Sequence, residues 1–263
     1  LPIGPCEPIN SIESFSEFEN KKLFPAILKQ SKFGYDGKGQ HQVNSISEVK
    51  AVLNGSNENE FILEKKLNLD KEISVVLSRS SDGESEIFPV IENQHEAGIL
   101  DLSIIPARVS ENFKKEAVSC ALKIAKNLNY VGTIAVEFFI SDGQLYVNEI
   151  APRPHNSGHF SLDACNVSQF DLQVLSLVDK SLIEINLEKN AVMLNLLGDL
   201  WFKNGEPKTP NFEEIEGPGI NIHLYGKNQP RSGRKMGHIT VVGEKLENLI
   251  NQVEEIRLKL LEM

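Results

Sequence analysis

The sequence predicts a mixed α/β fold built from short strands, hairpins and amphipathic helices. Apolar runs of strand length alternate along the 263 residues with longer stretches in which apolar residues recur every three or four positions. Two pairs of β-rich runs also flank Asp82-Gly83 and Asp142-Gly143, and such a dipeptide between two strands is the sequence signal of a β-hairpin. These observations favour a fold that contains both sheets and packed helices.

The opening segment, LPIGPCEPINS, is a proline-rich connector of the kind that joins domains, so we expect the chain to be a fragment. An apolar stripe over 12–23 predicts a helix, and FPAILK at 24–29 predicts a short buried strand. Ser45 and Glu48 have the spacing of a capping box and predict the start of a second helix. A second strand is predicted at 61–67.

The remaining elements follow from the same patterns. In chain order they are a hairpin formed by 72–80 and 84–92, a helix from Ser110 to Leu128 with Ser110 as its cap, a hairpin formed by 131–140 and 144–151, a helix over about 161–180, short strands from 186 onward and a last helix over 245–261.

Composition excludes several classes of protein. The net charge is -10, and no cluster of Lys and Arg forms a basic stripe, so we expect no nucleic-acid partner. The three cysteines are widely spaced, which predicts neither a disulfide framework nor a zinc site and fits a reducing cytoplasm. No apolar run reaches the roughly 20 residues that span a bilayer. We therefore expect a cytoplasmic protein without a membrane partner.

The first candidate site combines a lysine with a glycine-rich loop. Lys29 ends an apolar strand, where an ammonium group is costly to bury unless an anion meets it, and phosphate is such an anion. The loop GYDGKGQ at 34–40 contains three glycines, which let backbone amides approach a ligand closely. The pattern is compatible with a phosphate lid and also with an ordinary surface turn. It is not a P-loop, because GxxxxGK[ST] is absent.

The second candidate site is a pair of acids, Glu137 and Glu149, each within an apolar strand of the second predicted hairpin. A three-residue turn with Gly143 as a bulge residue would place both carboxylates on one face, whereas a two-residue turn would oppose them. Converging carboxylates suit Mg²⁺. The alternative is a pair of solvated acids on the strand faces.

The third candidate site is the loop RPHNSGH at 153–159, stiffened by Pro152 and Pro154. Arg153 offers a fork for a planar oxyanion such as bicarbonate, and His155 is able to move a proton or to donate a hydrogen bond. A satisfied structural histidine is the alternative for His155, and equally for His95 in ENQHEAG.

Taken together, the segments ILK, GYDGKGQ, ENQHEAGILDLSIIPA, YVGTIAVEFF and VNEIAPRPHNSGH resemble the ATP-grasp portion of the 5-(carboxyamino)imidazole ribonucleotide synthase family. HLYGKNQPRSGRKMGHITVVG at 223–243 resembles the small last domain of that family, so the resemblance covers nearly the whole chain. Other ATP-grasp ligases share the lysine and the paired acids but not GYDGKGQ together with PRPHNSGH.

The resemblance implies an ATP-grasp domain over 1–185, with lobes over about 1–67 and 68–185, and a small β-rich C-terminal domain over 186–263. It also implies that the Rossmann-like domain with which the family begins is missing here, and that the full-length protein is a homodimer.

The resemblance further implies a reaction. Bicarbonate would be phosphorylated by MgATP to carboxyphosphate, and aminoimidazole ribonucleotide would capture the carboxyl group. The implied ATP-binding residues are Lys29, Gly34, Tyr35, Asp36, Gly37, Lys38, Gly39, Gln40, Glu64, Lys65, Leu67, Glu72, His95, Asn148 and Glu149, and the implied Mg²⁺ ligands are Glu137 and Glu149. The implied catalytic residues are Tyr35, Asp36, Arg153 and His155, and the implied substrate-binding residues are Asn156, Ser157, Lys227 and Arg234.

Two other functions are compatible with the residues. A related ATP-grasp ligase, such as formate-dependent glycinamide ribonucleotide transformylase, would share the nucleotide site but respond to formate and glycinamide ribonucleotide. A non-catalytic ATP-binding fragment would bind MgATP and release no phosphate in response to bicarbonate.

Overall fold

The computed structural model describes residues 1–9, 23–31, 39–56 and 60–262. The predicted helix over 12–23 and residues 34–38 of the glycine-rich loop therefore lie outside the described residues, apart from Leu23. Contacts divide the chain into two compact units. The first comprises residues 1–70, 97–99 and 139–148, and the second comprises 71–96, 100–138 and 149–263.

The first unit is built on an antiparallel sheet. In the described part of this unit, four strands pair in the order β1-β4-β2-β3, namely β1 (Cys6–Ile9), β4 (Phe61–Lys65), β2 (Ala26–Gln30) and β3 (Gln40–Val43). Helix α1 (Ile46–Gly55) begins at Ser45, whose hydroxyl accepts a hydrogen bond from the Glu48 amide, as the capping-box spacing predicts. Val49 of α1 is buried with Leu28 and Phe61 of the sheet, which places the core between helix and strands.

The second unit contains most of a larger sheet. Its described strands pair in the order β10-β9-β5-β7-β8-β11-β15-β14, with β6 beside β5. The bounds are β5 (Lys71–Arg79), β6 (Ser85–Ile87), β7 (Ile91–Glu96), β8 (Ile99–Ile105), β9 (Gly132–Ser141), β10 (Gln144–Ala151), β11 (Asn190–Leu197), β14 (Ile220–Leu224) and β15 (Lys235–Gly243). A separate short ribbon pairs β12 (Phe202–Lys203) with β13 (Glu206–Pro207).

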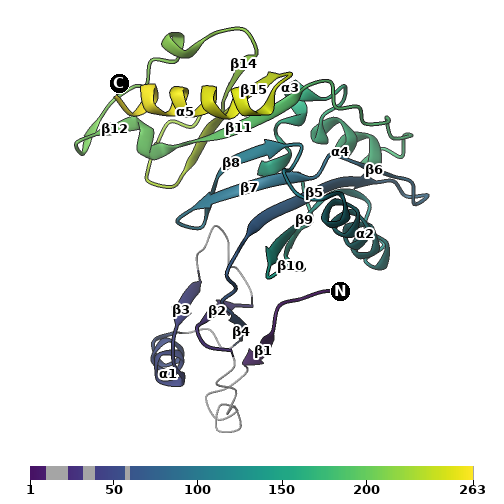
Figure 1. Ribbon diagram of the computed structural model, residues 1–263, viewed down its shortest axis with the longest axis vertical. Coiled ribbons are helices and arrows are strands. Elements are labelled where there is room, and N and C mark those ends of the chain that lie inside the picture. The colour runs from purple at the N-terminus through teal and green to yellow at the C-terminus, as the bar shows by residue number, and fades with distance from the viewer. Residues whose placement is uncertain (10–22, 32–38, 57–59, 263) are drawn as a thin grey trace. The chain divides into compact units, whose positions relative to one another are not determined.

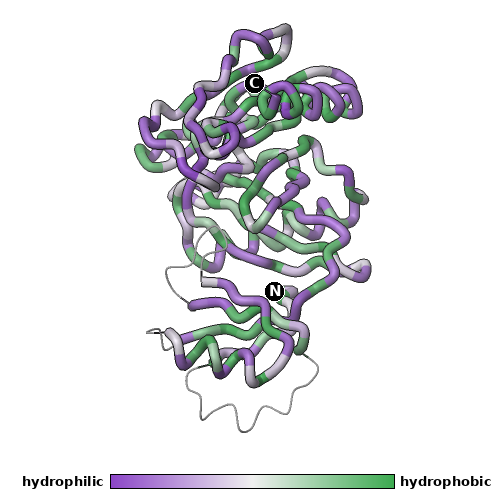
Figure 2. The backbone as a smooth tube through the Cα atoms, turned by 90° about the vertical axis from the view of Figure 1, so that its left-hand side faces the viewer, coloured by the Kyte–Doolittle hydropathy of each residue, from purple (hydrophilic) through white to green (hydrophobic). Residues whose placement is uncertain are grey.

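Helices cover the larger sheet (Figure 1). Helix α2 (Glu111–Asn127) is capped by Ser110, as predicted, and packs on β5, as does α4 (Gln169–Leu177). Helix α5 (Leu246–Glu262) lies along β11 and β15, and buries Val253 and Leu260 against them. Figure 2 shows hydrophilic and hydrophobic segments alternating along this helix, which is the amphipathic pattern that predicted it. Three short 3-10 helices complete this part, at Asn156–Gly158, Gly198–Trp201 and Phe212–Ile215.

Two predicted elements differ from the structure. The second arm of the hairpin at 84–92 is interrupted at 88–90, and the pairing with β5 shifts by one residue between β6 and β7, because Pro89 has no amide hydrogen to continue the ladder. The single helix predicted over about 161–180 is wrong. It is divided into α3 (Ser161–Ala164) and α4, because Ser168 and Asp171 form a capping box that starts a new helix.

The segment from 186 onward, expected as a small separate domain, continues the larger sheet. Strand β11 pairs antiparallel with β8 on one side, with Ala191 opposite Ile105, and with β15 on the other. Leu102 and Ile104 of β8 share a core with Leu194 of β11 and Ile256 of α5. Contacts accordingly group residues 149–263 with the second unit. In the described residues, no helix is long and apolar enough to cross a membrane.

Candidate active site

Lys29 is neutralised within the first unit. Its ammonium lies 2.6 Å from a carboxylate oxygen of Glu64 on the neighbouring strand, and 3.3 Å from the Oδ1 atom of Asn148. The Lys29 side chain retains 20% of its exposure, so an anion from solvent is able to reach it. The structure thus places two other predicted nucleotide-binding residues, Glu64 and Asn148, beside the Lys29 ammonium.

The other predicted nucleotide-binding residues that are described in this unit lie along strands β3 and β4 and next to their ends. Lys65 is exposed at the end of β4, and its amide donates to the Pro5 carbonyl, while Leu67 is half-buried just beyond the strand. Gly39 has a φ of 75°, and Gln40 is exposed opposite Lys29. This left-handed backbone conformation favours glycine, which explains why position 39 of the loop is a glycine. The rest of the predicted lid, Gly34, Tyr35, Asp36, Gly37 and Lys38, lies outside the described residues.

In the second unit, Glu72 and His95 form an ion pair between β5 and β7. A Glu72 carboxylate oxygen lies 2.8 Å from the His95 Nδ1 atom. Burial disfavours a charged imidazole, but the contact with Glu72 outweighs it and raises the pKa of His95. His95 thus lies half-buried against an acid of the neighbouring strand.

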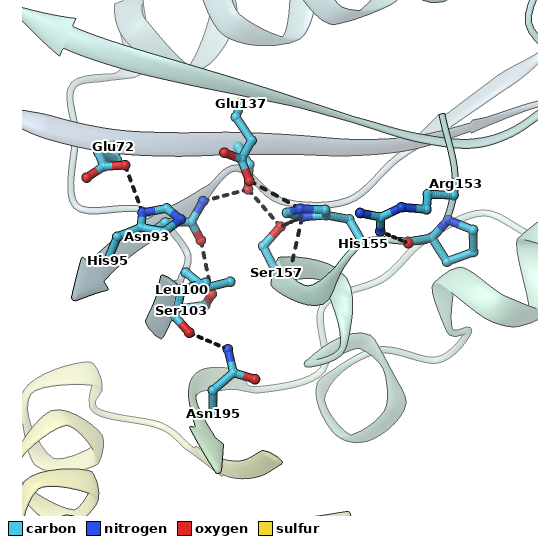
Figure 3. A network of polar contacts seen from close by, with 12 residues as sticks. Glu72, Asn93, His95, Leu100, Ser103, Glu137, Arg153, His155, Ser157 and Asn195 are labelled. Carbon is cyan, nitrogen blue, oxygen red and sulfur yellow. Dashed lines mark hydrogen bonds and ion pairs between the residues drawn. The ribbon is translucent and has the colours of Figure 1, made fainter. Parts of the chain in front are cut away.

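Glu137 is a buried carboxylate at the centre of the second unit (Figure 3). It is 8% exposed on β9, and one of its oxygens lies 3.2 Å from the His155 Nε2 atom. Burial and then the negative charge of Glu149 raise the pKa of Glu137 to about 7. A cation placed between the two acids would relieve both effects.

The turn that sets the register of Glu137 and Glu149 contains two residues. Asp142 and Gly143 both have positive φ, at 51° and 70°, and β10 begins directly at Gln144. The three-residue turn that would align the two acids is therefore absent from this hairpin. Burial along β10 does not alternate, however, because Tyr146 to Asn148 are all half-buried and Glu149 and Ile150 are both exposed. The turn alone thus does not fix the face of Glu149.

The loop at 153–159 is held from behind by a residue that sequence reasoning missed. The buried Gln169 side chain, at the start of α4, accepts from the His155 amide and donates to the His155 carbonyl, both at 2.8 Å. Gly158 lies so close to it that a Cβ atom there would come within 2.6 Å of the Gln169 amide oxygen. Arg153, by contrast, is exposed and donates to the Pro154 carbonyl at 3.0 Å. The two hydrogen bonds from Gln169 to the His155 backbone thus hold the loop at 153–159 in a defined conformation.

His155 and Asn156 differ in how their polar atoms are satisfied. The His155 Nδ1 atom lies 2.9 Å from the Ser157 hydroxyl, and burial together with the nearby cation Arg153 lowers the pKa of His155 to about 3. Asn156 is 8% exposed, yet neither atom of its amide group has a hydrogen-bond partner among the described residues. Leaving a buried amide unpaired costs free energy, so the side chain is suited to a polar ligand.

Lys227 and Arg234 lie in the connection between β14 and β15. The Lys227 ammonium sits 5.1 Å from the centre of the Tyr225 ring, and Arg234 donates to the Gln229 carbonyl at 2.6 Å. Partial burial and the positive charges of Arg234 and Lys235 lower the pKa of Lys227. A cluster of cations that repel one another in this way is suited to an anionic ligand such as a phosphate.

A second group that sequence reasoning missed surrounds His238. Asp163, His223 and His238 each offer a ligand atom within 4.8 Å of the others. The two imidazole rings stack, with centres 4.5 Å apart and an interplanar angle of 12°. A metal ion binds a histidine nitrogen in the plane of its ring, and no point lies in both of two stacked parallel planes. The arrangement is thus a stacked pair, with His223 hydrogen-bonded to Asp163 at 3.0 Å and His238 to Tyr225 at 2.9 Å.

The fold and this site define a class of protein. Residues 1–170 match the model of the ATP-grasp domain, and residues 191–252 match that of the phosphoribosylaminoimidazole carboxylase C-terminal domain. Because the first match covers more than half of the chain, the chain belongs to the ATP-grasp family.

Among curated proteins, the chain is similar to N5-carboxyaminoimidazole ribonucleotide synthase of Staphylococcus aureus (strain COL), with 43% identity over 236 residues. The match covers 88% of this chain and 59% of the relative, so the chain spans little more than half the length of that protein.

Two solved structures are similar as well. N5-carboxyaminoimidazole synthetase from S. aureus complexed with ADP has a TM-score of 0.84 at 37% identity, over 98% of this chain and 67% of that one. The synthase from Aspergillus clavatus in complex with ADP and 5-aminoimidazole ribonucleotide has a TM-score of 0.84 at 25% identity, over 100% of this chain and 69% of that one.

Proposed function

We propose that this chain carries the ATP-binding and carboxylating part of a 5-(carboxyamino)imidazole ribonucleotide synthase. In the proposed reaction, ATP phosphorylates bicarbonate to carboxyphosphate, and 5-aminoimidazole ribonucleotide takes the carboxyl group on its exocyclic amine. The names of the curated relative and of the complexes with ADP and 5-aminoimidazole ribonucleotide support this reaction. The family matches also support the division proposed from the sequence, with an ATP-grasp domain over 1–185 and a C-terminal domain over 186–263.

The observation that carries the proposal is the pairing of Glu137 with His155, next in the chain to the unpaired amide of Asn156. The pair is buried, and Asn156 offers both a donor and an acceptor that no described residue uses. Bicarbonate is small and planar, and it both donates and accepts hydrogen bonds, so it would match such an amide. Tyr35, Asp36, Arg153, Ser157, Lys227 and Arg234 are proposed to complete the sites for bicarbonate and the ribonucleotide.

Magnesium fits the acids of the second unit. Glu137 is buried and its pKa is raised in part by the charge of Glu149, which is the situation that a bound divalent cation relieves. We propose these two carboxylates as its ligands. Bound Mg²⁺ would neutralise charge on the transferred phosphoryl group.

Lys29 and Glu64 of the first unit are proposed to bind the nucleotide. The Lys29 ammonium, which contacts the Glu64 carboxylate in this structure, would then contact a phosphate of the nucleotide instead.

The remaining proposed nucleotide residues are Lys65, Leu67, Glu72, His95, Asn148 and the loop at 34–40. A homodimeric assembly is proposed from the resemblance, and a location in the cytoplasm is proposed from the three widely spaced cysteines.

The test is phosphate release from MgATP with bicarbonate, measured with and without 5-aminoimidazole ribonucleotide. We expect the ribonucleotide to stimulate release, and the variants Glu137→Gln and Glu149→Gln to abolish it. Glu116→Gln on the exposed face of α2 is the matched control and should behave like the unchanged chain.

Two results would overturn the assignment. Release that responds to formate and glycinamide ribonucleotide would identify a different ATP-grasp ligase. Binding of MgATP without any bicarbonate-dependent release would identify a nucleotide-binding fragment.

A further inference from the structure

The aromatic ring of Tyr225 contacts a lysine that is proposed to bind the ribonucleotide. Tyr225 comes directly after β14 and is half-buried, and its amide donates to the Met236 carbonyl of β15 at 2.9 Å. The ammonium of Lys227 lies over the face of the ring, 5.1 Å from its centre. An ammonium at this distance is attracted by the negative face of an aromatic ring. Tyr225 therefore gives the long, exposed side chain of Lys227 a preferred position.

The Tyr225 ring is itself held by two further contacts. Its hydroxyl lies 2.9 Å from the Nδ1 atom of His238, which is 1% exposed on β15. The ring also meets His159, the last residue of the loop at 153–159, in an edge-to-face arrangement with centres 6.2 Å apart. All of these residues belong to the second unit. One ring thus connects the loop proposed to bind bicarbonate with a cation proposed to bind the ribonucleotide.

Lys227 needs support of this kind because its surroundings disfavour a positive charge. Partial burial and the charges of Arg234 and Lys235 lower its pKa. The face of Tyr225 acts in the opposite direction, since it attracts a cation. A lysine ammonium has three N–H donors, and one of them is used by the Lys235 carbonyl. The ring therefore stabilises the charged ammonium in place and leaves donors for an anion.

We propose that Tyr225 is a positioning residue, whose ring face holds the Lys227 ammonium where the phosphate group of 5-aminoimidazole ribonucleotide binds. The identity of this anion rests on the proposed function, whereas the placement of Lys227 by the ring follows from the contacts. A cation that is already in place loses less conformational freedom when its ligand binds, so the ligand binds more tightly. We therefore expect the ring to act on the affinity for the ribonucleotide and not on the phosphorylation of bicarbonate.

The first test is phosphate release from MgATP and bicarbonate over a range of 5-aminoimidazole ribonucleotide concentrations. Tyr225→Leu removes the ring face, so we expect the KM for the ribonucleotide to rise about fivefold while kcat stays within about twofold. Tyr225→Phe keeps the face and loses only the hydroxyl. Its KM should stay within about twofold of the value for the unchanged chain, which a role of the hydroxyl alone would not allow.

Tyr130 supplies the matched control. It is likewise half-buried, and its hydroxyl donates to the Thr133 carbonyl at 3.1 Å, but it lies in the connection between α2 and β9 and belongs to none of the proposed sites. Tyr130→Leu and Tyr130→Phe should both leave the KM for the ribonucleotide within about twofold of the value for the unchanged chain.

The second test reads the placement of Lys227 by NMR of a chain whose lysines carry a carbon isotope label at Cε. Protons over the face of an aromatic ring give signals at unusually high field, and the Lys227 signal is identified by its loss in Lys227→Arg. We expect the high-field position in the unchanged chain and in Tyr225→Phe, and an ordinary position in Tyr225→Leu. Inorganic phosphate, the probe for anion binding, should shift this signal at about fivefold higher concentration in Tyr225→Leu.

Three results would contradict the inference. They are a Lys227 signal at ordinary field in the unchanged chain, which requires no variant to fold, a KM in Tyr225→Phe as high as that in Tyr225→Leu, and a Tyr225→Leu variant in which kcat falls while KM is unchanged. If the ribonucleotide does not stimulate phosphate release by the unchanged chain, the proposed function fails. The Lys227 signal and its response to inorganic phosphate then still decide whether Tyr225 places this cation for an anion.

Discussion

Glu92 and the two cations that contact it allow a prediction about which member of the group matters most for the stability of the fold. Glu92 on β7 is 1% exposed, whereas the side chains of Lys71 and Arg108 are 37% and 41% exposed. The carboxylate accepts from the Lys71 ammonium at 2.5 Å, from two guanidinium nitrogens of Arg108 at 3.0 and 2.6 Å, and from the Arg108 amide at 3.1 Å. Losing a cation therefore leaves a buried charge, whereas losing the acid leaves cations that can turn to water.

The magnitude follows from that asymmetry. Removing one partner of a buried ion pair costs about 3–5 kcal/mol, and Arg108→Met should fall at about 2–4 kcal/mol because Lys71 and the amide of residue 108 still reach the carboxylate. Glu92→Gln should cost only about 1–2 kcal/mol, since its amide oxygen still accepts and the cations are solvated. Equilibrium unfolding in urea at neutral pH measures both values. Equal costs, or a larger cost for Glu92→Gln, would refute the reasoning.

The contacts of Glu92 with Arg108 and Lys71 also predict how the stability of the fold depends on pH. Burial alone would raise the pKa of Glu92, but the hydrogen bonds from Arg108 and Lys71 outweigh it and lower the pKa. A carboxyl group with a lowered folded-state pKa stabilises the fold above its unfolded value of about 4.3, and this contribution is lost as the pH falls through the folded value. The difference between the unchanged chain and Glu92→Gln should be constant near neutrality and shrink below about pH 4.

Three further predictions follow from local geometry. Gly198→Ala should cost about 2 kcal/mol or more in urea unfolding, because a Cβ atom there would lie 2.2 Å from the Arg231 carbonyl oxygen, whereas Gly55→Ala, which meets nothing within 4 Å, should not destabilise the chain. Ser168→Ala should cost about 1 kcal/mol through loss of the α4 capping box, and a neutral result in thermal unfolding would contradict that role. Burial raises the pKa of Cys165 to about 12, so its alkylation at about pH 8 should be slow in the folded chain and fast after unfolding; equal rates would show that the thiol is not protected.

Local signals in the sequence predicted what local physics determines. Ser45 and Ser110 begin helices where their spacing to the next polar or apolar residue indicated, and Gly143 lies in the turn that its dipeptide predicted. The division of the helix at Ser168 was missed although its capping signal is also local, because the apolar stripe continues across it. The position of Glu149 could not be derived, since burial along β10 does not alternate from one residue to the next.

Contacts between distant residues were beyond such reasoning. Gln169 clamps the backbone of His155 from 14 residues away, and Ser74 meets Ser157 across 83 positions. No local sequence pattern around Gln169 or Ser74 indicates which distant residue each will contact. Such residues become visible only when the fold has placed strands and loops together. Glu137, in contrast, was found because an acid within an apolar strand is unusual in any fold, and His155 because it lies in a loop stiffened by prolines.

The pairing of β8 with β11 has a consequence for how this chain tolerates being cut. Strand β8 belongs to the segment that matches the ATP-grasp domain, and β11 to the segment that matches the C-terminal domain. A chain ended just before Asn190 would turn β8 into an edge strand, with unpaired amides and carbonyls beside the apolar side chains of Leu102 and Ile104. Exposed edges of that kind recruit other strands. Besides contributing Lys227 and Arg234 to the proposed substrate site, the C-terminal segment therefore covers the edge of β8 and protects it from aggregation.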